Sequence, residues 1–137
     1  MSWLVDTCIL LDVLESDSQF GRASARTIDR LAPDGLEVSP ITAVEIAPSF
    51  LGDPERQDLF FREIGVEVSA NWDLAARRAA EAAWAAHVLA RRKGLAPKRP
   101  VADVLIGALA LRHEGLVTRN PDDFLRHYPS LRIVVPS

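Results

Sequence analysis

The 137-residue chain has 48% hydrophobic residues, 26% charged residues and a formal net charge of −3. This size suits one well-buried core and is too small for two ordinary domains, so we expect a single domain over residues 1–137. The negative net charge argues against a protein that binds nucleic acid over its whole surface.

The N-terminal segment does not resemble a secretion signal. Its apolar run is interrupted by Asp6 and Asp12 and has no basic start. No stretch of the sequence reaches the length of a membrane span. The single cysteine, Cys8, excludes an internal disulfide and fits a reducing compartment. We therefore predict a cytoplasmic protein without a membrane segment.

Strand-like and helix-like patterns alternate along the chain. Short apolar runs predict strands at SWLVD, LEVSPI, VEVS, LVT and RIVV. Helices are predicted, in chain order, at residues 7–16, 20–31, 42–51, 54–64, 71–92, 101–115 and 120–128. The segment from Gly94 to Pro100 has the Gly, Pro and Lys/Arg content of a loop. The alternation favours a mostly parallel sheet with helices on both faces.

Acidic residues occur in four separate segments near the starts of predicted helices, mostly where a strand has just ended. They are Asp6, Glu45, Asp103 and the pair Asp122 and Asp123. In a parallel α/β sheet, ligands bind outside the carboxyl ends of the strands, so acids from distant segments can meet there. Packed carboxylates repel one another unless a cation lies between them. Because no Cys or His cluster accompanies these oxygen ligands, we predict a site for Mg²⁺ or Mn²⁺.

Helix capping is the competing explanation for the first two acids. Asp6 is a suitable N-cap for the helix that begins at Thr7. Thr42 and Glu45 match a capping box, in which Glu45 would bond back to the Thr42 amide. Taken singly, each of these acids is explained by capping alone.

The acids of the C-terminal half also have a structural explanation. Asp103 falls in a first helical turn, where the helix dipole favours an anion. Asp122 and Asp123 occupy the same kind of position behind Asn120. Asp103 follows a loop and not a strand, so its convergence with the others is the least constrained. Capping does not require acids in all four segments, however, and this recurrence favours the metal site.

Short polar residues flank the acids and fit a wet cleft. They are Thr7, Thr118 and Asn120, whose alternative role is turn and cap chemistry. Metal-assisted phosphodiester hydrolysis needs such equipment, because one cation activates water and a second, about 4 Å away, stabilises the leaving oxygen. A carboxylate that is not fully engaged can act as the base. Neither a G-x-S-x-G elbow nor a P-loop is present.

Two other sets of residues are open to interpretation. The segment from Arg77 to Arg99 is rich in Lys and Arg, with Glu81 as its one acid, and suits either a solvated helix face or a phosphate-contacting patch. His87, His113 and His127 lack the spacing of a zinc site or an acid/base pair, so we expect them at the surface or at helix ends.

Four segments carry a resemblance to a known family. In order they are WLVDTCILLD, SPITAVEI, PVADVLIGALALRHEG and LVTRNPDDF, of which the last two are the most specific. Over essentially its full length, the chain resembles the PIN-domain ribonucleases, and within them the VapC-type toxins of bacterial toxin-antitoxin pairs.

The resemblance implies roles for particular residues. Thr118 and Asn120 match supporting polar positions, and Asp122 is an additional acid at a position that the family varies. Asp123 is preferred over Asp122 because it immediately precedes Phe124. The family's metal-binding and catalytic acids carry over to Asp6, Glu45, Asp103 and Asp123.

The resemblance also implies a fold, an activity and partners. The fold is a three-layer α/β/α sandwich with a five-stranded parallel sheet, and the activity is Mg²⁺- or Mn²⁺-dependent cleavage of RNA within the chain. The partners are a second copy of the chain and a cognate antitoxin that blocks the active groove. Trp72, Leu74, Trp84 and Val88 give the long Ala-rich helix bulky side chains. Either they exceed what one small core can cover, which favours a homodimer, or all of them belong to the core. Cys8 departs from the family, since relatives often have Asn there.

Other functions remain open on the sequence. A phosphoryl-transfer receiver needs an adjacent acid pair and a lysine. A haloacid-type phosphatase needs Asp-x-Asp after its first strand. The segment VDTCILLD supplies neither pattern. A catalytically inactive PIN-fold binding module, acting through a protein partner, is the alternative from a different class. The presence of all four acids argues against it.

Overall fold

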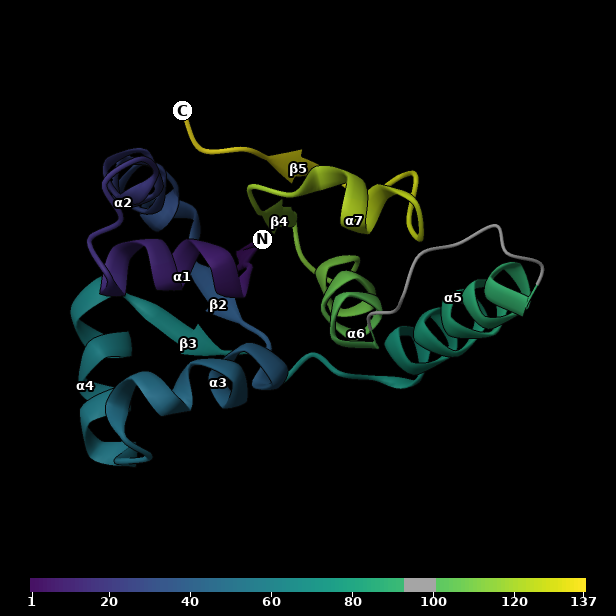
Figure 1. The fold of residues 1–137 in the computed structure, drawn as a ribbon, viewed down its shortest axis with the longest axis horizontal. Coiled ribbons are helices and arrows are strands. Elements are labelled where there is room, and N and C mark those ends of the chain that lie inside the picture. The colour runs from purple at the N-terminus through teal and green to yellow at the C-terminus, as the bar shows by residue number, and fades with distance from the viewer. Residues whose placement is uncertain (93–100) are drawn as a thin grey trace.

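The middle layer of the protein is a five-stranded parallel sheet (Figure 1). The structure, a computed structural model, describes residues 1–92 and 101–137. The strand order is β3-β2-β1-β4-β5, and all neighbouring strands run parallel. The strands are β1 Trp3–Val5, β2 Leu36–Val38, β3 Val66–Val68, β4 Gly115–Val117 and β5 Ile133–Val134. The chain builds the sheet outward in both directions from β1, so the carboxyl ends of β1 and β4 form the switch point where such sheets bind ligands.

Helices cover both faces of this sheet. They are α1 Thr7–Leu14, α2 Gly21–Leu31, α3 Pro40–Ile46, α4 Pro54–Ile64, α5 Leu74–Arg92, α6 Val101–Ala110 and α7 Pro121–Leu125, with short 3-10 turns η1 Ala32–Asp34 and η2 Ala47–Phe50. The predicted end of the long helix at Gly94, and the predicted loop that follows it, lie outside the described residues. Within residues 1–92 and 101–137, no helix is long and apolar enough to cross a membrane.

The alternation of side chains along the strands creates two cores. Val5 and Val117 point to one face and pack with α1, α2 and α4. Leu4 and Leu116 point to the other face and pack with α6 and α7, against which α5 lies (Figure 1). The predicted three-layer α/β/α sandwich is therefore confirmed, and fully buried strands of this kind are expected in a parallel sheet covered on both sides.

Several element boundaries, among them the ends of β2 and α6, differ from the sequence expectation. Strand β2 ends at Val38 and not at Ile41, because Ser39 accepts a hydrogen bond of 3.0 Å from the Ile41 amide and Pro40 opens α3. Helix α6 ends at Ala110, so that β4 can begin at Gly115. The first of these shifts changes how Glu45 is interpreted.

Candidate active site

Asp6 directly follows the central strand and begins α1. Its backbone amide donates to the Val117 carbonyl at 2.9 Å, which fixes it beside the end of β4. Its side chain is 6% exposed and accepts a hydrogen bond of 2.7 Å from the Thr7 amide. The capping role expected for Asp6 is thus real, but a single bond to Thr7 leaves most of the carboxylate available for other partners.

The next partner of Asp6 comes from the neighbouring strand. The buried hydroxyl of Thr118, one residue past β4, donates to Asp6 Oδ2 at 2.8 Å. Thr118 Oγ1 accepts in turn from the Asn120 amide at 3.1 Å. Asn120 is exposed and precedes α7, and its own side chain makes no cap hydrogen bond. Both predicted supporting residues of this segment therefore lie beside Asp6 or its immediate partner.

Glu45 reaches the same place from α3. The Thr7 hydroxyl donates to Glu45 Oε1 at 2.8 Å and lies 2.9 Å from the hydroxyl of buried Thr42. The capping-box interpretation of Thr42 and Glu45 is wrong, because Ser39 caps α3 and Glu45 bonds across to α1. We call Asp6, Thr7, Glu45 and Thr118 the Asp6 cluster.

The surroundings of Asp6 disfavour its ionised form. Burial raises the pKa of Asp6, and the charge on Glu45 raises it further, against the lowering effect of hydrogen bonds from Thr118 and Thr7. Half-buried Cys8 lies 3.4 Å from Asp6 Oδ2. Burial and the Asp6 charge raise the pKa of the Cys8 thiol to about 11. A cation bound here would relieve this penalty on Asp6.

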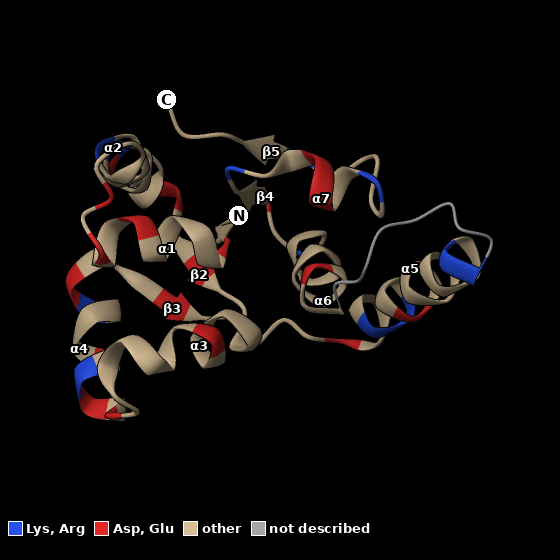
Figure 2. Ribbon diagram, in the orientation of Figure 1, with Lys and Arg blue, Asp and Glu red and all other residues tan. Residues whose placement is uncertain are grey.

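The remaining predicted acids stand at the starts of two other helices. Asp103 is partly buried in the first turn of α6, and Asp122 and Asp123 are exposed in the first turn of α7. Acidic positions appear on α3, α6 and α7 in Figure 2. Their attraction to the helix dipole is a sufficient reason for acids at these positions. The convergence of Asp103 and Asp123 on Asp6 stays a prediction.

The donor chemistry of the Asp6 cluster fits a hard divalent cation. Carboxylate and hydroxyl oxygens surround the position, and a neighbouring carboxylate disfavours the ionised form of Asp6. Across residues 1–92 and 101–137, no three or more Asp, Glu, His or Cys side chains are grouped so that they could hold a metal ion. The cluster thus contributes a linked pair of carboxylates, and a third would have to turn in from α6 or α7.

The expectation that the histidines lie at the surface or at helix ends is wrong for His87, which is buried in the middle of α5, and holds for His113, which follows the end of α6. His87 and His113 are each 5% exposed. His113 follows α6, and its Nδ1 lies 3.0 Å from the carbonyl of Leu109 in the last turn of that helix. His87 stacks on Trp84 with ring centroids 5.5 Å apart and meets the edge of His127 at 5.3 Å. The spacing of the sequence alone did not indicate this contact of three rings between α5 and the turn after α7.

The basic segment divides into two parts. Near the start of α5, Arg77 and Arg78 form ion pairs with Glu81 at 3.4 and 2.7 Å, as a solvated helix face does. Arg91 and Arg92 are exposed at its end. The other three basic residues, Lys93, Lys98 and Arg99, lie outside the described residues. Contact of this segment with RNA stays a prediction.

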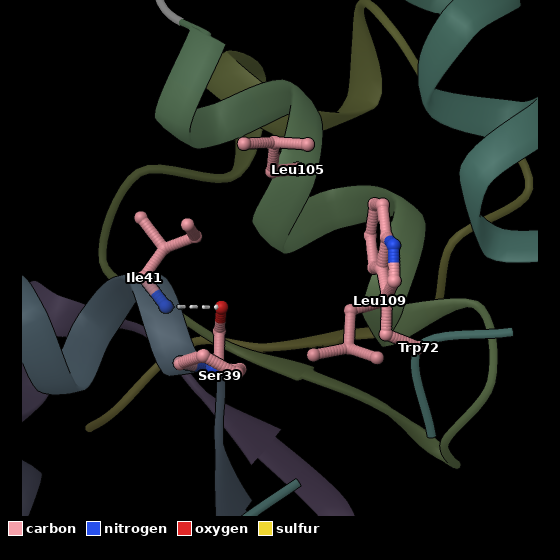
Figure 3. A pocket seen from close by; sticks show the side chains of 6 residues that line it. Ser39, Ile41, Trp72, Leu105 and Leu109 are labelled. Atoms are coloured by element: carbon pink, nitrogen blue, oxygen red, sulfur yellow. Dashed lines mark hydrogen bonds between the residues drawn. The ribbon is translucent and has the colours of Figure 1, made fainter. Parts of the chain in front are cut away.

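An apolar pocket opens beside the start of α3 (Figure 3). Its volume is about 370 Å³, and Ile41, Leu105 and Leu109 form much of its wall. Trp72, in the segment between β3 and α5, is 40% exposed and also lines a second apolar pocket with Trp84. The apolar surface of this region therefore extends from α3 across α6 to α5.

Sequence analysis missed an ion pair that adjoins the Asp6 cluster. Asp12 is 3% exposed and pairs with Arg119, the residue after Thr118. A signal for it was present in the sequence, because Asp12 is three positions after Ile9 and so shares the buried face of α1. An acid on an apolar helix face requires a partner, although the sequence does not say which one.

The family to which this chain belongs follows from its sequence. A family model for the PIN domain matches residues 3–129. The chain belongs to the PIN domain family. No curated protein sequence matches it significantly.

Solved structures share the PIN domain fold at low sequence identity. A crystal structure of VapBC2 from Rickettsia felis, bound to a DNA fragment from their promoter, aligns with a TM-score of 0.71 at 17% identity and covers 100% of both chains. A structure of FitAB bound to an IR36 DNA fragment aligns at 0.67 with 18% identity, over 97% of this chain and 94% of that one. A DNA-bound VapBC from Salmonella typhimurium aligns at 0.62 with 21% identity, over 98% of each chain.

Proposed function

We propose that this PIN domain is a metal-dependent endoribonuclease and the VapC-type toxin of a toxin-antitoxin pair. The observation that carries the proposal is the Asp6 cluster. It places a buried carboxylate at the switch point of the sheet and links it to a second carboxylate through Thr7. Membership of the PIN domain family and the likeness to VapBC and FitAB complexes support the same conclusion.

The catalytic role falls to the acids. We propose that Asp6, Glu45, Asp103 and Asp123 hold Mg²⁺ or Mn²⁺, and that Asp122 adds negative charge beside them. A divalent cation bound by such oxygens activates water and neutralises charge on the phosphate. Thr118 holds Asp6 Oδ2 in one orientation, and a carboxylate left without a full set of partners accepts a proton from water.

The proposal includes protein partners. The similar solved structures are of VapBC and FitAB bound to DNA. We propose that this chain likewise binds a small antitoxin, and that it forms a homodimer through the apolar surface around Trp72. The half-exposed indole between two apolar pockets supports a protein contact there.

Cleavage of a fluorophore-labelled structured RNA, with MnCl₂ or with EDTA, tests the activity. We expect cleavage only with metal, and losses of orders of magnitude in Asp6→Ala and Asp103→Ala. Cleavage that survives chelation or these substitutions would overturn the mechanism. If the protein binds an antitoxin co-expressed from the adjacent reading frame but cleaves no RNA, it is instead an inactive PIN-fold binding module.

A further inference from the structure

Asp12 and Arg119 form a paired contact between α1 and the connection from β4 to α7. Arg119 Nε donates to Asp12 Oδ2 at 2.7 Å, and Nη2 donates to Oδ1 at 3.0 Å. Ser24 on α2 also donates to Oδ2 at 2.9 Å. A two-point guanidinium–carboxylate pair fixes direction as well as distance, so the Arg119 side chain has little freedom while Asp12 holds it.

A second contact restrains the same guanidinium. The Arg119 Cζ atom lies 4.1 Å from the centroid of the Phe20 ring, within cation–π range. Phe20 is itself held by the loop before α2, where its amide donates to Asp17 Oδ1 at 2.8 Å. Arg119 is thus fixed by a carboxylate from α1 and by a ring that precedes α2. We call Asp12, Arg119 and Phe20 the Arg119 clamp.

The backbone of Arg119 lies between two residues of the candidate site. On one side is Thr118, whose hydroxyl bonds to Asp6, and on the other is Asn120, whose amide bonds to Thr118 Oγ1. Asn120 also precedes α7, the helix that carries Asp123. Because three consecutive residues share one backbone path, a clamp on the middle side chain restrains both neighbours.

We propose that the Arg119 clamp is a positioning device that keeps the Thr118 hydroxyl on Asp6 and holds the start of α7 at the edge of the Asp6 cluster. The proposal rests on the proposed nuclease function for its catalytic consequence. Its structural half, the fixing of Thr118 beside Asp6, does not depend on that function. Asp12 and Arg119 are positioning residues, because they act through Thr118 and α7.

Cys8 provides a readout of the clamp that needs no RNA. It is the one cysteine of the chain, and its Sγ lies 3.4 Å from Asp6 Oδ2 and 3.8 Å from Thr118 Oγ1. The thiol is half-buried between Asp6 and Thr118, so a reagent in solution reaches it slowly while the Thr118 segment stays in place. Release of the Thr118 segment would expose the thiol and accelerate its reaction with a disulfide reagent such as DTNB.

The test compares Arg119→Met, Asp12→Asn and their double variant with a matched control. Arg112→Met is the control, because it removes an arginine whose pairing with Asp73 at 3.0 Å lies away from the clamp. Each protein is assayed for kcat and KM on a labelled RNA hairpin with MnCl₂ and for the Cys8 reaction rate. Far-UV circular dichroism and a melting curve confirm that each variant is folded at the assay temperature.

We expect Arg119→Met to lower kcat by about tenfold or more with little change in KM, as loss of a partner that orients a metal ligand does. Cys8 should react faster, and the double variant should lose no more than the worse single variant, because one unit is broken in each case. Arg119→Lys, which keeps the charge and one hydrogen bond, should retain intermediate activity. If Arg119→Met does not fold, Asp12→Asn and Arg119→Lys carry the same comparison.

The clamp proposal is overturned if folded Arg119→Met matches wild type in kcat and in Cys8 rate, or if Arg112→Met changes both as much. Failure of the proposed function has a different signature. If the wild-type protein cleaves no RNA with any divalent metal, the nuclease proposal fails, while the Cys8 rates still decide whether the clamp fixes Thr118.

Discussion

The hydroxyl of Thr7 donates a hydrogen bond of 2.8 Å to Glu45 Oε1. The amide of the same threonine donates to Asp6 at 2.7 Å, so one residue joins the two carboxylates of the Asp6 cluster. This arrangement places the charge of exposed Glu45 beside buried Asp6, which costs stability unless a cation or a proton compensates. The first two predictions follow from that cost.

Replacing Asp6 by Asn should leave the metal-free protein as stable as wild type or more stable at neutral pH. Burial and the Glu45 charge raise the pKa of Asp6 above its unfolded value, so its contribution to stability is full at acid pH and is lost as the pH rises through the folded pKa. Asn carries no charge and still accepts from the Thr7 amide. Melting temperatures in EDTA across pH 4 to about 8 measure this, and a strongly destabilised Asp6→Asn at neutral pH would show that the carboxylate acts chiefly as a cap.

Asp103→Asn should weaken the stabilisation that metal gives. A ligand that binds only the folded state stabilises it by roughly 2.7 kcal/mol at a hundredfold excess over its dissociation constant. Wild type should therefore melt at a higher temperature in millimolar MnCl₂, and Asp103→Asn should gain much less. Glu55→Gln is the matched control, because Glu55 is an exposed acid in the first turn of α4. Equal gains for wild type and Asp103→Asn would remove Asp103 from the metal site.

Acid should destabilise the contact between α5 and the turn after α7 through His127. Burial is the main cause that lowers the pKa of His127, and charge on His87 and Arg126 adds to it. A lowered pKa means that the unfolded chain binds the proton more tightly, so this contribution to stability is present above about pH 6.5 and is lost as the pH falls through the folded pKa. Unfolding by urea at pH 7.5 and 5.5 should show a smaller loss in His127→Phe than in wild type. An equal loss of stability in both proteins would mean that a group other than His127 causes the acid sensitivity.

Trp72→Glu should weaken self-association of the chain. Trp72 is 40% exposed between two apolar pockets, and a carboxylate there would have to be desolvated in any apolar interface. Leu89→Glu is the matched control, since Leu89 is an exposed apolar residue of α5 that lines neither pocket. Analytical ultracentrifugation at tens of micromolar should show a dimer for wild type and for Leu89→Glu, and a smaller species for Trp72→Glu. A monomeric wild type would contradict the homodimer proposal.

The fold was accessible from the sequence because its signals are local and redundant. Gly65 closes α4 in the left-handed conformation and Asp53 caps its start, so both ends of the helix predicted at residues 54–64 carry a local signal. The alternation of apolar runs and helical patterns then left few topologies other than a parallel sheet covered on both faces. The sequence predicts the start of α3 two residues late, because the strand-like run LEVSPI includes Pro40. A proline is nevertheless well suited to open a helix.

The candidate site was accessible only in part. The positions of Asp6 and Thr118 at the carboxyl ends of two strands followed from the strand patterns, but the pairing of those two strands did not. The partner of Glu45 did not, because a capping box and a bond to Thr7 use the same residue types, and only the packing of α3 on α1 distinguishes them. The pairing of Asp12 with Arg119 spans 107 positions, and no local pattern specifies such a distance.

The bond between Thr118 and Asp6 has a consequence for the newly made chain. Its two residues are 112 positions apart, and β4 is the strand that must insert beside β1 before the bond can form. A ribosome releases the N-terminal residues first, so Asp6 emerges long before its partner exists. Until β4 and Thr118 have left the exit tunnel, Asp6 cannot be held by this strand. The candidate site is therefore completed only after most of the chain has been synthesised.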